Sequence, residues 1–156
     1  MSLSAYRMRQ EPDYSVSAPA LAQVASFRAL ELPGHAAEEG RRQLIEKLAA
    51  SGQLKAGFLL RVLQQSQIQL FELGFAHLLG IEQVRLSRVL YDGGPCLLAL
   101  ACHAVAIDRA VFPTVYSLSR RSRRMPHLLE ASERLEAIAV FETYSRAEAL
   151  ALLTAV

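Results

Sequence analysis

Residues 75–91, FAHLLGIEQVRLSRVLY, decide the expected fold. They align without gaps on residues 101–117, ACHAVAIDRAVFPTVYS, at an offset of 26 positions, and this places His77 on His103. An earlier stretch, LKAGFLLRVL (54–63), aligns on IEQVRLSRVL at an offset of 27 and shares Arg-Val-Leu with it. A helical hairpin that cannot bury its apolar stripe alone stacks on similar neighbours. The repeat therefore predicts an all-α domain of stacked, HEAT-like or solenoid-like hairpins, with an irregular multi-helix bundle as the alternative.

The chain on either side of this repeat also has the composition and turn signals of helices. Hydrophobic residues make up 52% of the sequence, led by Leu and Ala, which are strong helix formers. No stretch shows the two-residue alternation of a half-buried strand. Asp108 is expected as an N-cap, and Pro126 in the first turn of a long helix. We expect helices over 36–50, 54–64, 68–79, 82–90, 95–105, 108–120 and 126–143, preceded by one near Pro19 and followed by one behind a Ser145–Glu148 capping box.

The length of 156 residues fits one domain. Residues 1–16 have no sustained periodicity and are expected to form a loose arm. A single all-helical domain is expected over 17–156, with 54–120 as its repeat core. The opening Met1-Ser2-Leu3 is typical of an expression vector. We therefore expect the chain to be part of a longer protein.

Charge and cysteine content limit the classes of partner and compartment. The chain has 17 basic and 15 acidic residues, and its net charge of +2 argues weakly against nucleic acid as the main partner. In a helix, Cys96 and Cys102 would lie about 9 Å apart along the axis, so they cannot form a disulfide. No apolar stretch is long enough to span a membrane, and no secretory signal is present. We expect free thiols and a cytoplasmic location.

Four motifs resemble a bacterial family known as domain of unknown function 2336. They are LLRVL (59–63), QLFELGFAHLLGI (69–81), VRLSRVLYDGG (84–94) and LLALACHAVAID (97–108). These motifs consist mainly of core leucines and turn glycines, so they specify a fold better than a site. The resemblance implies helical, HEAT-like repeats that often lie within longer chains. It implies no established activity, cofactor or catalytic residue.

The sharpest charged feature is the run Arg120-Arg121-Ser122-Arg123-Arg124. Guanidinium groups of Arg120, Arg121, Arg123 and Arg124 could bind an acidic partner segment, a phosphate or a nucleic-acid backbone. Alternatively, cations at a helix C-terminus interact favourably with the helix dipole. In that second interpretation the arginines could also pair with carboxylates of the next helix, at Glu130, Glu133 and Glu136.

Residues 75–90 also have the spacing of a DNA-binding helix-turn-helix, with a turn at Gly80. Arg85 and Arg88 would then face the major groove. Glu82 argues against this interpretation because its negative charge would meet phosphate at the start of the recognition helix. Recurrence of the pattern at 101–117 favours a structural repeat instead.

Reactive constellations are lacking in the sequence. His77, His103 and Cys102 could approach one another across stacked helices, but no metal-ligand spacing supports a site. The sequence contains no G-x-S-x-G elbow, P-loop or H-E-x-x-H motif. We expect no catalytic residue, no metal and no cofactor. The prediction is a non-enzymatic, protein-interaction or regulatory module that contacts another protein or a neighbouring domain. Nucleic-acid binding is the alternative, and homo-oligomerisation is left open.

Overall fold

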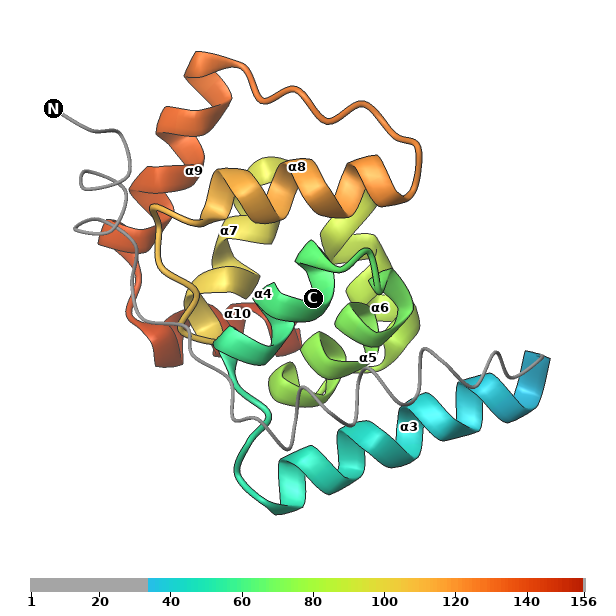
Figure 1. Ribbon diagram of the computed structural model, residues 1–156. Helices are drawn as coiled ribbons and strands as arrows, with labels where there is room; N and C mark the ends of the chain where they lie inside the picture. Colours follow the sequence, from blue (N-terminus) through green and yellow to red (C-terminus); the bar gives the residue numbers. More distant parts are fainter. Residues whose placement is uncertain (1–33, 156) are drawn as a thin grey trace, which may run out of the picture.

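The computed structural model describes residues 34–155, which form eight α-helices and one π-helix without any strand in this range (Figure 1). The prediction of an all-α domain is confirmed for these residues. The expected arm at 1–16 and the helix near Pro19 lie outside the described residues. The elements are α3 (Gly34–Ala50), α4 (Ala56–Gln64), α5 (Ile68–Leu79), α6 (Gln83–Ser87), the π-helix η1 (Arg88–Asp92), α7 (Gly94–Ala104), α8 (Phe112–Ser122), α9 (Ala131–Thr143) and α10 (Arg146–Ala155).

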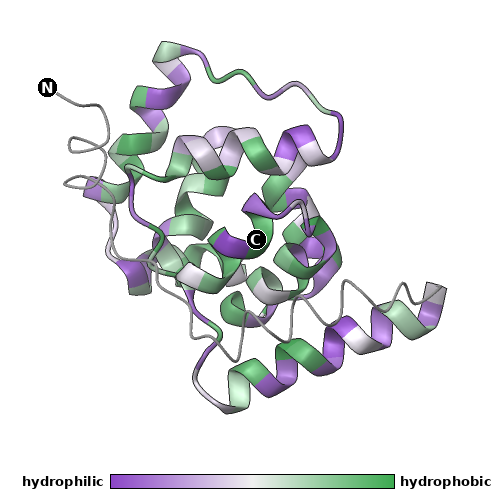
Figure 2. Ribbon diagram, viewed as in Figure 1, coloured by the Kyte–Doolittle hydropathy of each residue, from purple (hydrophilic) through white to green (hydrophobic). Residues whose placement is uncertain are grey.

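The core forms around α4, α5 and α7. Helix α7 contacts η1, α8, α9 and α10, while α4 packs on α5 and α8, and α3 packs on α5. Four phenylalanines are among the largest fully buried side chains: Phe58, Phe71, Phe75 and Phe112. Figure 2 shows hydrophobic residues concentrated on α4, α5 and α7, whereas α3 carries many hydrophilic residues. Because α10 returns to α7, spatial contacts do not simply follow chain order, and HEAT-like stacking stays a prediction.

Helices α3, α4, α5, α7 and α8 end in the same backbone motif. In each, a residue in the left-handed region donates its N–H to the carbonyl three residues earlier, and the next N–H reaches the carbonyl five residues earlier. This is the pattern of a Schellman motif, which satisfies carbonyls that a helix end leaves free. Glycine occupies the left-handed position in two cases and other residues in three: Gly52, Ser66, Gly80, Ala106 and Arg124. The chain therefore ends each of these five helices in the same kind of turn.

The predicted start of α8 was wrong. Asp108 does not cap this helix, because its Oδ1 accepts a hydrogen bond from the backbone N–H of Ala110 at 2.8 Å and forms a local turn. Helix α8 begins at Phe112, with Pro113 in its first turn. Proline suits that position because the N–H it lacks has no partner within the first turn of a helix.

The predicted start of α9 at Pro126 was also wrong. Residues 125–130 are not helical, and α9 begins only at Ala131 (Figure 1). The N–H of Glu130 donates to the Glu133 carboxylate at 3.3 Å, so the helix starts where a side chain satisfies the backbone at its entrance. The predicted capping box before α10 is confirmed. There the Ser145 N–H donates to Glu148 at 2.8 Å, and the Glu148 N–H donates to Ser145 Oγ at 3.1 Å.

The helix expected over 82–90 changes character part-way. Regular α-helix covers Gln83–Ser87, and the backbone then continues as the π-helix Arg88–Asp92. Such wider turns place side chains and carbonyls differently from an α-helix. No helix within residues 34–155 has both the length and the apolar composition that crossing a membrane requires.

Candidate functional site

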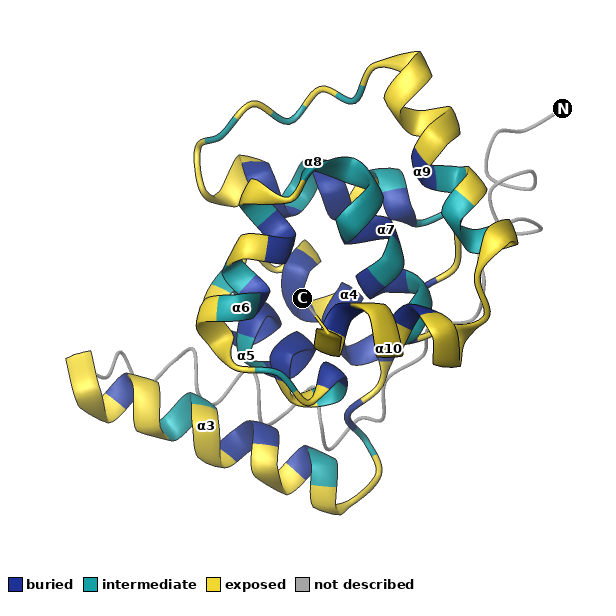
Figure 3. Cartoon of the chain, turned by 180° about the vertical axis from the view of Figure 1, so that it is seen from behind, coloured by how far each residue is buried: buried dark blue, intermediate teal, exposed yellow. Residues whose placement is uncertain are grey.

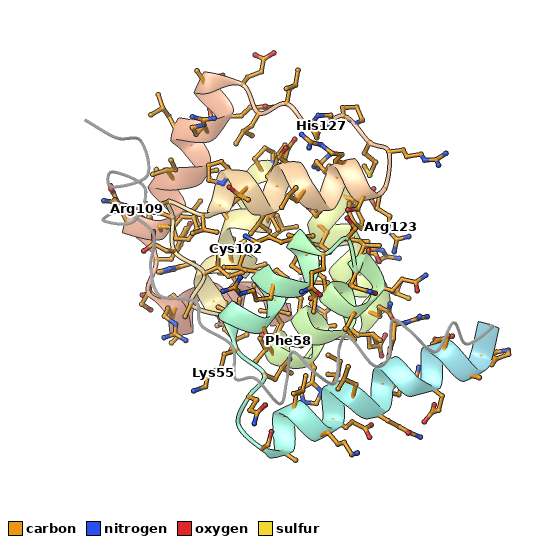
Figure 4. All side chains as sticks on the ribbon, in the orientation of Figure 1. Lys55, Phe58, Cys102, Arg109, Arg123 and His127 are labelled. Atoms are coloured by element: carbon orange, nitrogen blue, oxygen red, sulfur yellow. The ribbon has the colours of Figure 1, made fainter. Side chains whose placement is uncertain are left out.

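The residue after α8, Arg123, binds a carboxylate of α5. Its Nη2 lies 2.7 Å from both carboxylate oxygens of Glu72, and its Nε donates to Glu72 Oε1 at 3.0 Å. The Glu72 side chain is only 2% exposed, whereas that of Arg123 is 40% exposed. Figure 4 shows Arg123 at the end of α8, beside the other helices of the core. The pair therefore joins α8 to α5 by a charge-assisted contact that is buried on one side.

Tyr91 of η1 completes this contact. Its hydroxyl donates to Glu72 Oε1 at 2.6 Å, so Glu72 accepts from both Tyr91 and Arg123. Burial and the neighbouring Glu72 carboxylate raise the pKa of Tyr91 well above its usual range. The hydrogen bonds to Glu72 likewise raise the pKa of Arg123. These three side chains hold α5, η1 and the end of α8 together.

Arg120 is also turned inward. It is 8% exposed, its Nη2 donates to the carbonyl of Tyr91 at 3.3 Å, and its guanidinium lies 4.5 Å from the ring centroid of Tyr116. Its buried Nε has no hydrogen-bond partner among residues 34–155. The ring of Tyr116 and the carbonyl of Tyr91 partly compensate the positive charge of Arg120. Arg120 therefore makes its contacts inside the protein.

The other two arginines of this run point outward. Arg121 and Arg124 are exposed, and no ion pair or side-chain hydrogen bond joins either of them to another residue within 34–155. Pairing with carboxylates of α9 was one interpretation of the sequence, and the described residues show no such pair. Arg124 has a φ of +56°, in the left-handed region that residues other than glycine rarely adopt. We call residues 120–124 the arginine segment; it has two inward and two outward cations.

The sequence pattern identifies the arginines but not the residues that hold them. Glu72 is the one carboxylate within the apolar run of α5, IQLFELGFAHLL, and this was a usable signal that it needs a partner. Its partner Arg123 lies 51 positions away, which no local pattern could reveal. Tyr91 and Tyr116 were also missed, because a tyrosine on an apolar face ordinarily indicates only core packing.

The residues of the nucleic-acid alternative have different surroundings. Arg85 is half-buried, and its Nη2 donates to the carbonyls of Leu153 and Thr154 at 3.2 and 3.1 Å. It therefore satisfies carbonyls at the end of α10. Arg88 is exposed on η1. The helix that would enter a groove has only five residues before the π-helix begins. Contact with nucleic acid stays a prediction.

His77, His103 and Cys102 lie in different environments. His103 Nε2 lies 2.7 Å from the carbonyl of Tyr144, and the His103 ring packs edge-on to Phe141. Cys102 is fully buried, and burial raises the pKa of its thiol. His77 is exposed on α5. No group of three or more His, Cys, Asp or Glu side chains suited to a metal ion occurs in the described part of the chain.

An open pocket of about 470 Å³ lies where the turn before α8 meets α9. An ion pair between Arg109 and Glu142 is part of its lining. Figure 4 shows Arg109 and Arg123 near opposite ends of α8, so this pocket is separate from the arginine segment. Its lining residues are His103, Ala106, Ile107, Asp108, Arg109, Phe141 and Glu142.

A family model described as "Uncharacterised protein conserved in bacteria (DUF2336)" matches residues 5–154. The chain belongs to this family. The match confirms the resemblance that the leucine-rich motifs predicted. No curated protein and no solved structure shows a significant match to the chain.

Within this DUF2336 chain, the arginine segment is the most distinctive candidate site. Two outward guanidinium groups can each form paired hydrogen bonds with a carboxylate or a phosphate. Their inward neighbours fix the backbone that carries them through Glu72, Tyr91 and Tyr116. The arrangement is suited to recognition of an anionic group.

Proposed function

We propose that this domain is a non-catalytic protein-interaction module that binds an acidic segment of a partner protein through Arg121 and Arg124. The observation that supports the proposal most directly is the division of the arginine segment. Arg120 and Arg123 are held by contacts within the fold, whereas Arg121 and Arg124 face solvent without a described ionic partner. A surface of this kind presents positive charge from a fixed backbone.

Physical properties of the surroundings favour a protein ligand. Leu128, in the segment after Arg124, is 85% exposed, so an apolar contact lies close in sequence to the two cations. Protein interfaces combine arginines and exposed apolar side chains in this way. An acidic segment with an interspersed apolar residue would match both features. Association should then weaken with salt, because exposed charges are screened.

Nucleic acid is the competing ligand, because a guanidinium binds phosphate as well as carboxylate. The near-neutral charge of the chain and the use of Arg85 at the end of α10 favour protein. Arg88 remains exposed and would be expected to contribute to a nucleic-acid surface. Nucleic-acid binding is therefore a separate outcome of the test of this proposal.

The test uses two double charge reversals with equal net charge. In the first, R121E/R124E, the proposed binding residues are reversed. In the control, K55E/R146E, two exposed residues beside helix N-termini are reversed, where a negative charge is tolerated. Figure 4 shows Lys55 far from Arg123. Circular dichroism and urea unfolding establish that both variants fold like the parent chain.

Each immobilised protein is exposed to bacterial lysate, and retained proteins are identified and then tested as purified ligands. The proposal expects a ligand that binds the parent and K55E/R146E but loses at least about tenfold in affinity for R121E/R124E, as expected for losing two charge-assisted contacts. Equal retention by all three proteins contradicts it. Retardation of duplex DNA at low salt that depends on Arg121, Arg124 and Arg88 would support the alternative instead.

A further inference from the structure

Most of the surface of helix α9 is not covered by other residues of the described range 34–155. Of its 13 residues only Ala137 is buried, and Leu135 is 71% exposed. Leu135 lies two residues before Ala137, which corresponds to about 200° around the helix axis. Leu135 therefore points away from the side of α9 that packs on the domain. Figure 3 shows exposed residues along much of α9. A large apolar side chain therefore lies at the centre of an outward face.

Small residues flank this leucine on the same face. Ala131 and Ala139 lie one turn before and one turn after Leu135, and both are exposed. Residues four apart form a continuous ridge on a helix surface. Solvent-facing ridges ordinarily carry polar residues, whereas this one reads Ala-Leu-Ala. Alanines beside a central leucine allow another helix to approach closely.

Opposite charges stand on the two sides of the ridge. Arg134 and Glu136 come immediately before and after Leu135, so they lie about 100° to either side of it. Both are exposed, and neither forms an ion pair with another residue of the described range. The outward face thus has a basic edge at Arg134 and an acidic edge at Glu136, while Glu142, seven residues after Leu135 on the same face, is already paired with Arg109.

We propose that this face binds a second copy of the chain, with the two α9 helices packed in parallel across a two-fold axis. In a parallel pair the basic edge of one helix meets the acidic edge of the other, which brings Arg134 beside Glu136 of the second copy, twice. In an antiparallel pair the basic edges of the two helices would face each other, and so would the two acidic edges. The charge pattern therefore selects the parallel arrangement. Leu135 packs on its own counterpart at the centre, with Ala131 and Ala139 on either side.

The contact is small. A helix of 13 residues is about 20 Å long, so the two ridges cover less area than a standard protein interface. We expect a weak, reversible dimer with a Kd of about 10–100 μM. This proposal rests on α9 alone and is independent of the ligand of the arginine segment.

Sedimentation equilibrium from low micromolar to about 1 mM protein measures the association. We expect a monomer–dimer equilibrium in the parent chain and at least about a tenfold higher Kd in Leu135→Lys. The matched control is Val84→Lys, because Val84 is 64% exposed on α6. A parent chain that stays monomeric throughout, or a Leu135→Lys variant with unchanged Kd, overturns the proposal.

Two further measurements test the parallel arrangement. R134E and E136R should each weaken dimerisation, and the double variant R134E/E136R should restore it. Cross-linking is done with Cys96→Ser, which removes the half-buried thiol, while Cys102 is fully buried. In this background Ala131→Cys should form a symmetric disulfide dimer under mild oxidation. Cross-linking only between Ala131→Cys and Ala139→Cys chains would show an antiparallel pair and overturn the proposed arrangement.

Discussion

Arg123 binds both carboxylate oxygens of Glu72, a residue 51 positions earlier, and only the glutamate is fully withdrawn from solvent. The asymmetry determines what each partner does when it is left alone. An unpaired Arg123 can turn toward water, because its side chain is 40% exposed. An unpaired Glu72 would keep a negative charge in the core, with Tyr91 as its remaining donor.

This asymmetry predicts unequal costs for removing the two partners. Arg123→Ala should lower the free energy of unfolding by about 3 kcal/mol, because it leaves a buried charge uncompensated. Glu72→Gln should lower it by only about 1 kcal/mol, because the amide keeps a hydrogen-bond acceptor at the same place. Urea unfolding of both single variants and the double variant measures the two costs and their coupling. Equal costs, or additive ones, would argue against the pair as the link between α5 and α8.

The raised pKa of Tyr91 predicts a loss of stability in alkaline solution. In the unfolded chain this phenol loses its proton near pH 10, whereas in the folded protein it keeps the proton to higher pH. Stability from this group is therefore complete below pH 10 and falls above it, by up to about 1.4 kcal/mol per pH unit. Tyr91→Phe should be less stable at neutral pH but should show a shallower decline. Parallel curves for the two proteins between about pH 9 and 11 would contradict this explanation.

The shared Schellman motif predicts opposite effects of one exchange at two equivalent positions. Ala106 and Gly80 both occupy the left-handed position, with φ of +66° and +68°. Ala106→Gly should raise the free energy of unfolding by about 0.5–1 kcal/mol, and Gly80→Ala should lower it by about 1 kcal/mol. A Cβ at Gly80 would meet no atom within 4 Å, so the expected loss comes from backbone conformation alone. Changes of the same sign in both variants would show that side-chain packing dominates.

Hydrophobic spacing and turn residues were sufficient to predict most of the helices. The bounds of α5 were predicted to the residue, and Ser145 and Glu148 form the expected capping box. Starts that depend on competing polar contacts were not predictable in the same way. Asp108 could equally cap a helix or close a local turn, and Pro126 fits a first turn or an extended segment. In both cases a hydrogen bond that the pattern does not specify decides the outcome.

The candidate site was predictable only as a run of like charges. Nothing in the spacing of the four arginines states which of them face the core, because this depends on where α5 and η1 lie in space. Arg120 and Arg123 contact the Tyr91 carbonyl and the Glu72 carboxylate, both from distant segments, and Arg120 also contacts the ring of Tyr116, one turn earlier on α8. Long-range contacts of this kind follow from tertiary packing and leave little trace in local sequence.

The division of the arginine segment is tested most directly by hydrogen exchange of the arginine Nε–H groups, followed by NMR in the parent chain. We expect slow exchange at Arg123, whose Nε donates to Glu72, and at Arg120, whose Nε is buried. We expect fast exchange at Arg121 and Arg124, and Glu72→Gln should accelerate exchange at Arg123. Uniformly fast exchange at all four arginines would contradict the claim that two of them are held within the fold.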